Sequence, residues 1–278
     1  MDPCEGSLAE FPKLHPFLGK ERRMNIKGCK AIVTGGASGL GEACIRNFIK
    51  AGAQAAILDL DSARGEKLAA ELGGNAIFVK TDITSEEGVQ SAIKKTLDSF
   101  GSINTVINCA GIGDPAKMLS KKGPMPLALF NRVVQINLVG TFNVARLAVV
   151  EMVNNNPNED GEKGVIINTA SVAAFDGQIG QPAYAASKAG VVGMTLPLAR
   201  ECADYGIRVM TIAPGIFNTP MLDILPQAAR DALGKMIPFP SRLGRPDEYA
   251  SLVTHIIENP MLNGEVIRLD GAIRMAAR

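Results

Sequence analysis

The sequence predicts a doubly wound α/β domain, built on a seven-stranded parallel sheet with helices on both faces. Two patterns carry this prediction. Short β-branched runs alternate along the chain with longer helical stretches, and such strand–helix–strand units form right-handed crossovers between parallel strands. The strand runs also lack polar alternation, which indicates strands that are buried on both faces.

The expected strands and helices follow one another through most of the chain. The predicted strands, each an apolar run with β-branched residues, are 30–34, 54–59, 76–80, 103–108, 164–168, 207–212 and 265–269. The predicted helices are 39–52, 62–73, 85–100, 127–153, 182–204 and 246–258. Together they assign residues 24–278 to a single domain.

Two segments interrupt this alternation. Residues 154–163 (NNNPNEDGEK) are wholly polar, so we expect a solvated loop there. Residues 214–246 are rich in proline and carry scattered apolar side chains such as Met221, Leu222 and Phe239. So much apolar content in a helix-poor connection favours a substrate lid over a nonpolar cavity. The alternative is a packed excursion of the chain that binds no ligand.

Residues 1–23 are expected to form a weakly ordered N-terminal extension. They mix proline, glycine and charged residues without periodicity, and they lack the apolar core of a secretory signal. Their acidic residues Asp2, Glu5 and Glu10 are untypical of a mitochondrial presequence, which is rich in arginine and poor in acids. We therefore expect a cytoplasmic protein, with the mitochondrial matrix as the alternative.

The composition excludes several classes of protein. The chain has 29 Lys and Arg against 28 Asp and Glu, so its net charge of +1 offers no basic surface typical of a nucleic-acid partner. No apolar run approaches the ~18 residues of a membrane span. The five cysteines form no Cys-x-x-Cys pair, which favours reduced thiols. With only two histidines, we expect neither a metal site nor a Ser-His-Asp triad.

The first predicted strand runs directly into a glycine-rich turn, residues 34–41 (TGGASGLG), which a predicted helix follows. Such a unit places backbone N–H groups and the positive end of the helix dipole at one point, where a pyrophosphate can bind. Gly35, Gly39 and Gly41 allow positive φ and let phosphates approach the backbone. The pattern therefore predicts a Rossmann-type nucleotide site. The alternative is a tight turn that collected glycines for its shape alone.

The end of the second predicted strand, Asp59, selects the nucleotide. A carboxylate at this point accepts hydrogen bonds from the adenosine ribose and repels a 2′-phosphate, so we predict NAD rather than NADP. The alternative is that Asp59 only ends a strand while Asp61 caps the next helix. The ends of the third and fourth predicted strands add three candidate contacts to adenine and ribose: Asp82, Ile83 and Cys109.

Tyr184 and Lys188 are the candidate catalytic pair, because they lie on one face of a predicted helix, one turn apart. A free phenol is a poor base at neutral pH, and a nearby ammonium favours the phenolate. Ser171 ends the fifth predicted strand and can hold the substrate oxygen, and Asn137 lies in the preceding helix. The alternatives are a turn residue at Ser171, a solvated lysine at Lys188 and a buried amide at Asn137.

These motifs, together with 108–111 (NCAG) and 214–215 (PG), resemble the short-chain dehydrogenase/reductase family over residues 25–278. The resemblance implies that Tyr184 is the catalytic base and that Lys188 binds the nicotinamide ribose and lowers the tyrosine pKa. It also implies that Ser171 orients the substrate and that Asn137 holds a water relay to Lys188. It places eight residues at the NAD: Ser38, Leu40, Asp59, Asp82, Ile83, Cys109, Phe217 and Thr219.

Longer segments resemble family members that act on acyl-CoA thioesters. These segments are 164–187, 206–215, 238–244 and 257–275. They imply a homotetramer that uses NAD to oxidise short-chain (S)-3-hydroxyacyl-CoA and its 2-methyl-branched relatives to 3-ketoacyl-CoA, reversibly. Lys121 and Lys122 fall in a loop that resembles one meeting the CoA phosphates in such proteins, and a solvated basic loop is the alternative.

Two other functions stay open on the sequence. A dehydrogenase of hydroxysteroids or other secondary alcohols would keep the same chemistry, and the apolar lid permits it. Some family members serve instead as structural subunits of RNA-processing assemblies, in which their own turnover is dispensable. The complete set of Asn137, Ser171, Tyr184 and Lys188 argues against a purely structural role.

Overall fold

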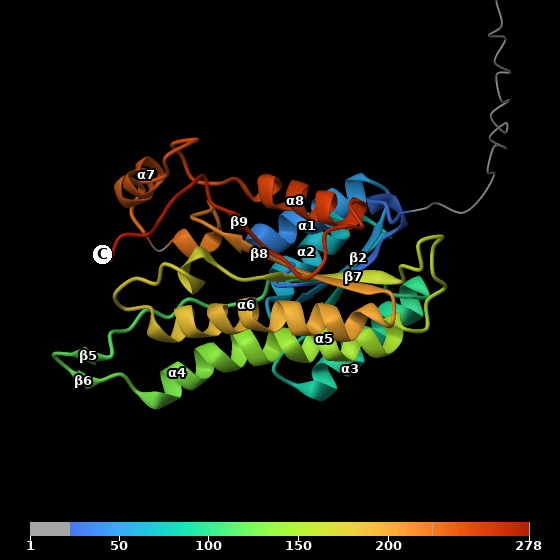
Figure 1. The fold of residues 1–278 in the computed structure, drawn as a ribbon, viewed down its shortest axis with the longest axis horizontal. Coiled ribbons are helices and arrows are strands. Elements are labelled where there is room, and N and C mark those ends of the chain that lie inside the picture. Colours follow the sequence, from blue (N-terminus) through green and yellow to red (C-terminus); the bar gives the residue numbers. More distant parts are fainter. Residues whose placement is uncertain (1–22, 224, 278) are drawn as a thin grey trace, which may run out of the picture.

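The computed structural model describes residues 23–223 and 225–277. The extension predicted for residues 1–23 therefore lies, apart from its last residue, outside the described residues. Seven parallel strands form a sheet in the order β3-β2-β1-β4-β7-β8-β9, which confirms the predicted fold class (Figure 1). The strands are β1 Lys30–Thr34, β2 Gln54–Asp59, β3 Ala76–Lys80, β4 Thr105–Asn108, β7 Gly164–Thr169, β8 Ile207–Pro214 and β9 Val266–Leu269.

Helices cover both faces of this sheet (Figure 1). One face carries α1 Gly39–Lys50, α2 Ser62–Leu72 and α8 Pro246–Glu258. The other face carries α3 Glu86–Phe100, α4 Leu127–Val134, α5 Thr141–Met152 and α6 Pro182–Ala203. The predicted helices and strands all occur, with ends within about two residues of the expected ones, which is the usual uncertainty of such boundaries.

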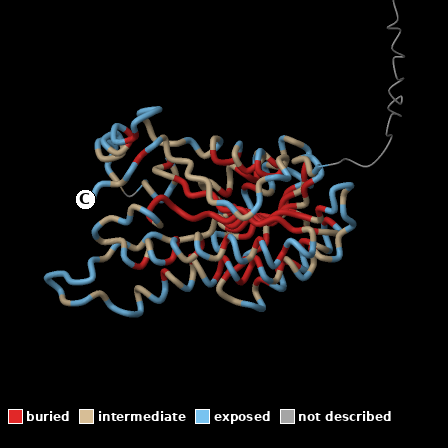
Figure 2. Tube along the Cα trace, viewed as in Figure 1, coloured by how far each residue is buried: buried red, intermediate tan, exposed pale blue. Residues whose placement is uncertain are grey.

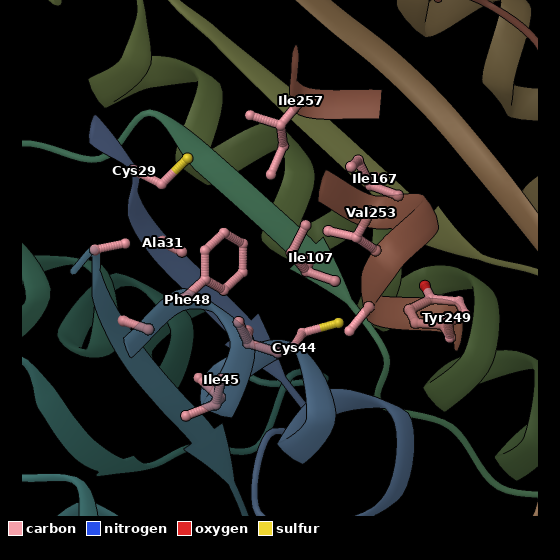
Figure 3. Close-up of a cluster of buried hydrophobic side chains, with 14 of the residues drawn as sticks. Cys29, Ala31, Cys44, Ile45, Phe48, Ile107, Ile167, Tyr249, Val253 and Ile257 are labelled. Atoms are coloured by element: carbon pink, nitrogen blue, oxygen red, sulfur yellow. The ribbon is translucent and has the colours of Figure 1, made fainter. Parts of the chain in front are cut away.

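The core consists of two hydrophobic layers that the sheet separates. Successive side chains of a strand point to opposite faces. In β1, Ala31 and Val33 join the cluster under α1 and α8, part of which Figure 3 shows, while Ile32 joins the cluster under α3 and α5. Figure 2 shows the buried residues concentrated along the sheet. Both faces are apolar, and this explains why the strand sequences show no polar alternation.

The predicted helix 127–153 is continuous, but its middle, Gln135–Gly140, is π-helical. Such segments are rare and occur frequently at functional sites, and this one contains Asn137. The described residues include one helix long and apolar enough to cross a membrane, Leu127–Met152, and 44% of its most apolar window is buried inside the protein. A helix that packs on a sheet passes the same test, so this finding does not by itself indicate a membrane protein.

One helix and one short hairpin were not predicted. The segment 214–246 contains α7 Gln227–Lys235, so the expectation of a helix-poor connection was wrong. The sequence of α7 (QAARDALGK) is rich in alanine and follows Pro226, and both features suit a helix and its start. In addition, β5 Leu119–Ser120 and β6 Gly123–Pro124 form a short antiparallel hairpin, which projects from the body of the domain (Figure 1).

The polar segment 154–163 is a loop, but one of its side chains is not solvated as expected. Glu162 is buried and pairs with the buried Arg208, with 2.7 Å between Oε1 and Nε. Arg208 also donates to the backbone carbonyls of Ile256 and Ile257 at the end of α8. The loop therefore supplies the counter-ion for an arginine that closes the last turn of α8, because a buried charge requires a partner.

Candidate active site

The candidate site lies at the carboxyl edge of the sheet, where the strand order reverses. From the central pair β1 and β4, the chain winds outward through β2 and β3 on one side and through β7, β8 and β9 on the other. Ligands of open α/β sheets bind outside the strand ends at such a switch point. Most predicted site residues directly follow the ends of these strands, so the topology brings them to one edge.

The glycine turn between β1 and α1 has the shape that a bound pyrophosphate requires. Gly35 and Gly39 have φ of 62° and 56°, a region that other residues rarely adopt. A Cβ on Gly35 would lie 2.9 Å from the backbone of Ala110, and one on Gly41 would meet the carbonyl oxygen of Gly35. Bare backbone therefore lines the turn at the N-terminus of α1, and the turn fits a dinucleotide.

Three further predicted cofactor residues lie around this turn. Ser38 is the N-cap of α1 and makes no side-chain capping bond, while Leu40 packs against the core. Thr219 lies against the turn, because a Cβ on Gly39 would be 3.3 Å from the Cβ of Thr219. The side chain of Phe217 is buried in the core instead. Thr219 thus brings the segment after β8 to the turn.

Asp59 is fixed beside the same turn. Its carboxylate accepts hydrogen bonds from the backbone N–H of Ala37 at 3.1 Å and of Asp61 at 3.0 Å. Asp61 caps α2 by accepting from the N–H of Arg64, as the alternative interpretation of this segment expects. An ionised carboxylate has about four acceptor sites, so Asp59 retains the capacity to accept from ribose hydroxyls.

The three remaining residues predicted to contact the cofactor differ in how exposed they are at the carboxyl edge of the sheet. Asp82 is exposed, and its carboxylate accepts from the N–H and the hydroxyl of Thr84. Ile83 is buried and lies against Gly140, where a Cβ would approach its side chain to 2.8 Å. The thiol of Cys109 turns into the core toward Thr169. The backbone of Cys109 is therefore the part that would contact a ribose.

The structure brings together three of the predicted catalytic side chains. Ser171 starts a 3-10 turn after β7, and its Oγ accepts from the N–H of Ala173 at 3.1 Å. Tyr184, in the first turn of α6, lies close enough to Ser171 for that side chain to lower the pKa of the phenol. Lys188 lies one turn further along, with Nζ 5.9 Å from the centre of the Tyr184 ring. The Ser171 hydroxyl, the Tyr184 phenol and the Lys188 amine thus lie close together.

Lys188 is not the solvated residue that the alternative expects. It is only 4% exposed, and its Nζ donates to the backbone carbonyl of Thr169 at 2.8 Å. Burial disfavours the charged form and lowers the pKa of Lys188 from 10.5 to about 8, partly offset by the nearby thiol of Cys109. The amine therefore titrates near neutral pH, in the range in which active-site groups work.

The pKa of Tyr184 moves in the direction opposite to the sequence argument. Burial raises it above 10, and the Ser171 side chain opposes this effect. The amine of Lys188 lies 5.9 Å from the centre of the ring and does not contribute to this shift. Within this chain, the group that stabilises the phenolate is therefore Ser171.

Asn137 is fully buried, and protein groups bond its side-chain oxygen and both of its amide N–H donors. Its Oδ1 accepts from the N–H of Ile112 at 2.8 Å, and its Nδ2 donates to the carbonyl of Ile112 at 2.9 Å and to Ser187 Oγ at 3.1 Å. This pattern fixes the segment after β4 against α6. A Cβ on Gly111 would lie 3.1 Å from Asn137 Oδ1 and 3.4 Å from Lys188 Nζ, so the two groups flank that glycine.

Lys121 and Lys122 are not in the immediate site. Both are exposed and occupy the turn of the projecting β5–β6 hairpin (Figure 1). The base of the hairpin is tied to the loop before α6 by a hydrogen bond of 2.8 Å from the N–H of Ala116 to the carbonyl of Gly180. The lysines therefore extend from a segment that borders the catalytic helix.

Sequence reasoning missed two partners of the catalytic residues. Thr169 supplies the carbonyl that holds Lys188, and Ser187 links Asn137 to the backbone carbonyl of Tyr184. Only their positions, beside Ser171 and Lys188 in the chain, could have indicated them. Within the described residues, no group of three or more His, Cys, Asp and Glu side chains is placed to hold a metal ion.

We expect Lys188→Met to stabilise the fold while it removes the charge from the site. The pKa of Lys188 in the folded protein, about 8, lies below its ordinary value of 10.5. Below pH 8 the buried amine is charged, so the full cost of burying this charge lowers the stability of the fold. That cost disappears as the pH rises from 8 to 10.5. The free energy of unfolding of the variant should therefore exceed that of wild type by on the order of 2 kcal/mol at pH 7. At pH 10 the two values should be nearly equal.

Urea denaturation at the two pH values measures this difference, and Lys95→Met on the exposed face of α3 is the matched control. The control should change the unfolding free energy little at either pH. A Lys188→Met protein that is less stable than wild type at pH 7 would show that the ammonium contributes net stability to the fold.

This sheet, glycine turn and tyrosine–lysine helix define a known class. A family model described as short chain dehydrogenase matches residues 30–229, and the chain belongs to that family. Among curated relatives, 3-hydroxyacyl-CoA dehydrogenase type-2 of Drosophila melanogaster is 56% identical over 252 residues, which cover 90% of this chain and 99% of the relative.

Two solved structures extend the comparison. A crystal structure of 3-hydroxyacyl-CoA dehydrogenase type-2 from Mycobacterium avium superposes with a TM-score of 0.87 at 42% identity, covering 91% of this chain and 98% of the other. A 3-ketoacyl-(acyl-carrier-protein) reductase from Brucella melitensis, complexed with NADH, gives a TM-score of 0.79 at 31% identity, covering 88% and 98%. The likeness to these two structures therefore covers about nine-tenths of this chain.

Proposed function

We propose that this protein is an NAD-dependent 3-hydroxyacyl-CoA dehydrogenase that interconverts short-chain 3-hydroxyacyl-CoA and 3-ketoacyl-CoA. The observation that carries the proposal is the meeting of Tyr184, Ser171 and the buried Lys188 at the sheet edge that holds the glycine turn. The 3-hydroxyacyl-CoA dehydrogenases that share 56% and 42% of its sequence support the choice of substrate.

In this proposal, the side chains of the site move one proton and hold one oxygen. Ser171 hydrogen-bonds the substrate oxygen, and Tyr184 accepts the hydroxyl proton during oxidation and returns it during reduction. Lys188 holds a ribose, and its amine lies over the ring of Tyr184. NAD, when bound, supplies the hydride acceptor. Asn137 keeps the segment after β4 in place against the catalytic helix.

The choice of NAD over NADP rests on Asp59. Its carboxylate is held beside the glycine turn by two backbone hydrogen bonds, and a 2′-phosphate would meet this negative charge. The Brucella melitensis reductase with the same fold binds NADH, which is consistent with this cofactor.

Reduction of acetoacetyl-CoA by NADH tests the proposed reaction directly. We expect turnover with acetoacetyl-CoA and oxidation of short (S)-3-hydroxyacyl-CoA, including the 2-methyl-branched thioester, at higher kcat/KM than any hydroxysteroid. A hydroxysteroid with the higher kcat/KM would instead show that the segment 214–246 shapes the site for bulky alcohols. A protein that oxidises neither class would refute the proposal.

The lysines of the hairpin give a separate prediction about the CoA moiety. We propose that Lys121 and Lys122 pair with CoA phosphates, and double replacement by alanine should raise KM for acetoacetyl-CoA about tenfold with little change in kcat. KM for an N-acetylcysteamine thioester, which lacks the nucleotide, should stay unchanged. If both KM values equal those of wild type, the hairpin has no role in binding CoA.

We also propose that the protein works as a homotetramer. Exposed apolar side chains lie on α5 and its neighbour α6 and require cover. They include Val139 just before α5, Phe142 and Val150 on α5, and Leu196 on α6. Light scattering should give four times the chain mass, and Phe142→Glu should yield smaller particles. A monomeric wild-type protein at micromolar concentration would contradict this state.

A further inference from the structure

Tyr249 on α8 heads the largest fully buried side chains of the described part of the chain. It belongs to the hydrophobic cluster under α1 and α8 (Figure 3). A buried phenol needs a hydrogen-bond partner, and its oxygen lies 2.7 Å from Thr169 Oγ1. The thiol of Cys109 donates to the same oxygen at 3.8 Å. One hydroxyl from α8 thus joins the ends of β4 and β7.

Thr169 is also the residue that holds Lys188. Its carbonyl accepts from Lys188 Nζ at 2.8 Å, while its side chain contacts Tyr249. It is the last residue of β7, paired with Ile212 of β8, and the chain turns away immediately afterwards toward Ser171. Ladder pairing therefore fixes Thr169 only from one side, and the bond to Tyr249 supplies a second constraint.

We propose that Tyr249 is a positioning residue of the active site: its hydroxyl fixes Thr169, and the carbonyl of Thr169 in turn holds the Lys188 ammonium. The role of Lys188 in turnover rests on the function proposed above. The contact chain from α8 to Lys188 is independent of the substrate.

The titratable groups around Tyr249, Thr169 and Lys188 determine whether loss of the Tyr249 hydroxyl raises or lowers the pKa of Lys188. Cys44 on α1 and Cys109 after β4 face Tyr249, and Cys109 and Tyr184 face Lys188. The bond to Tyr249 is among the causes that lower the pKa of Cys109, and Cys109 in turn raises that of Lys188.

Loss of the Tyr249 hydroxyl therefore acts on Lys188 in two ways. It removes a constraint on Thr169, whose carbonyl accepts from Lys188, and it removes one of the hydrogen bonds that lower the pKa of Cys109. Both changes disfavour the ammonium form of Lys188, so both lower its pKa.

The test is a titration of Lys188 in the apoprotein, labelled with 13C at lysine Cε and assigned with Lys188→Arg. We expect a wild-type midpoint of about 8. In Tyr249→Phe, the midpoint should fall by about half a unit or more, because a hydrogen bond to a charged group is weakened. Thr169→Val should lower it likewise, whereas Thr169→Ser, which keeps the hydroxyl, should restore it.

Tyr205→Phe, at a half-exposed tyrosine beyond α6, is the control and should leave the midpoint unchanged. A folded Tyr249→Phe protein with the wild-type midpoint would overturn the proposal. Should Tyr249→Phe not fold, equal midpoints in Thr169→Val and Thr169→Ser would overturn it. No substrate enters this titration, so its failure is distinct from a failure of the proposed function.

Kinetics add a second readout. In Tyr249→Phe, kcat for acetoacetyl-CoA should fall several-fold while its KM stays constant, because the change acts on the proton-transfer machinery and not on the thioester pocket. The alkaline limb of the pH profile should move to lower pH with the Lys188 midpoint. A loss of kcat with an unmoved limb would mean that Tyr249 serves only the packing of α8.

Discussion

Replacing Tyr184 with phenylalanine is expected to reduce kcat by on the order of 10³-fold, because a positioned acid–base group contributes about 10²–10⁴-fold. The substitution removes one oxygen and leaves the ring, so the packing of α6 and the affinity for NAD should persist. Since burial raises the pKa of Tyr184, wild-type alcohol oxidation should increase with pH through the neutral range. The variant should lose this dependence.

Steady-state kinetics from pH 6 to 10, with NAD binding measured by calorimetry, check this result. Tyr205→Phe serves again as the control and should keep wild-type kcat, because that tyrosine lies outside the site. A Tyr184→Phe protein with wild-type kcat would exclude the phenol as the proton carrier. The proton would then have to pass to another group at the sheet edge.

Gly41→Ala should weaken NAD binding. The new Cβ would meet the carbonyl oxygen of Gly35 and lie 3.0 Å from the Cα of Gly36, and all of these are backbone atoms that cannot step aside cheaply. Strain of about 1–3 kcal/mol is expected from such overpacking. Because the turn itself must move, we expect the affinity for NAD to fall about tenfold or more and the melting temperature to drop.

Gly193→Ala is the matched control, since this glycine lies exposed on α6 and an added Cβ meets no atom within 4 Å. It should leave NAD affinity unchanged and stabilise the helix by about 0.5–1 kcal/mol. Calorimetric titration of both variants with NAD measures the difference. Wild-type affinity in Gly41→Ala would show that the turn is not the pyrophosphate site.

The sheet and its main helices could be predicted because each depends on local sequence. The β1 run 30–34 is buried on both faces, and α1 begins directly after the glycine turn, so neighbouring residues alone carry the signal. The hairpin 119–124 and α7 gave weaker signals, because strands of two residues have no periodicity and prolines surround the helix. The buried state of Glu162 depends on Arg208, which lies far along the chain.

The candidate site was predictable in its residues but not in its electrostatics. The spacing of Tyr184 and Lys188 on one helix face is a property of the sequence. The burial that lowers the pKa of Lys188 and raises that of Tyr184 comes from packing by distant elements. The packing of distant elements also determines the surroundings of Tyr249. Its contact with Thr169 exists only because α8 packs across the end of β7.

The most direct measurement of the central claim uses NADH that carries deuterium at both hydrogen positions of its reactive carbon, with acetoacetyl-CoA as the second substrate. Mass spectrometry of the 3-hydroxybutyryl-CoA formed should show one deuterium at C3 with the wild-type protein and almost no product with Tyr184→Phe. Product without deuterium, or equal product from the two proteins, would contradict hydride transfer assisted by the Tyr184 phenol.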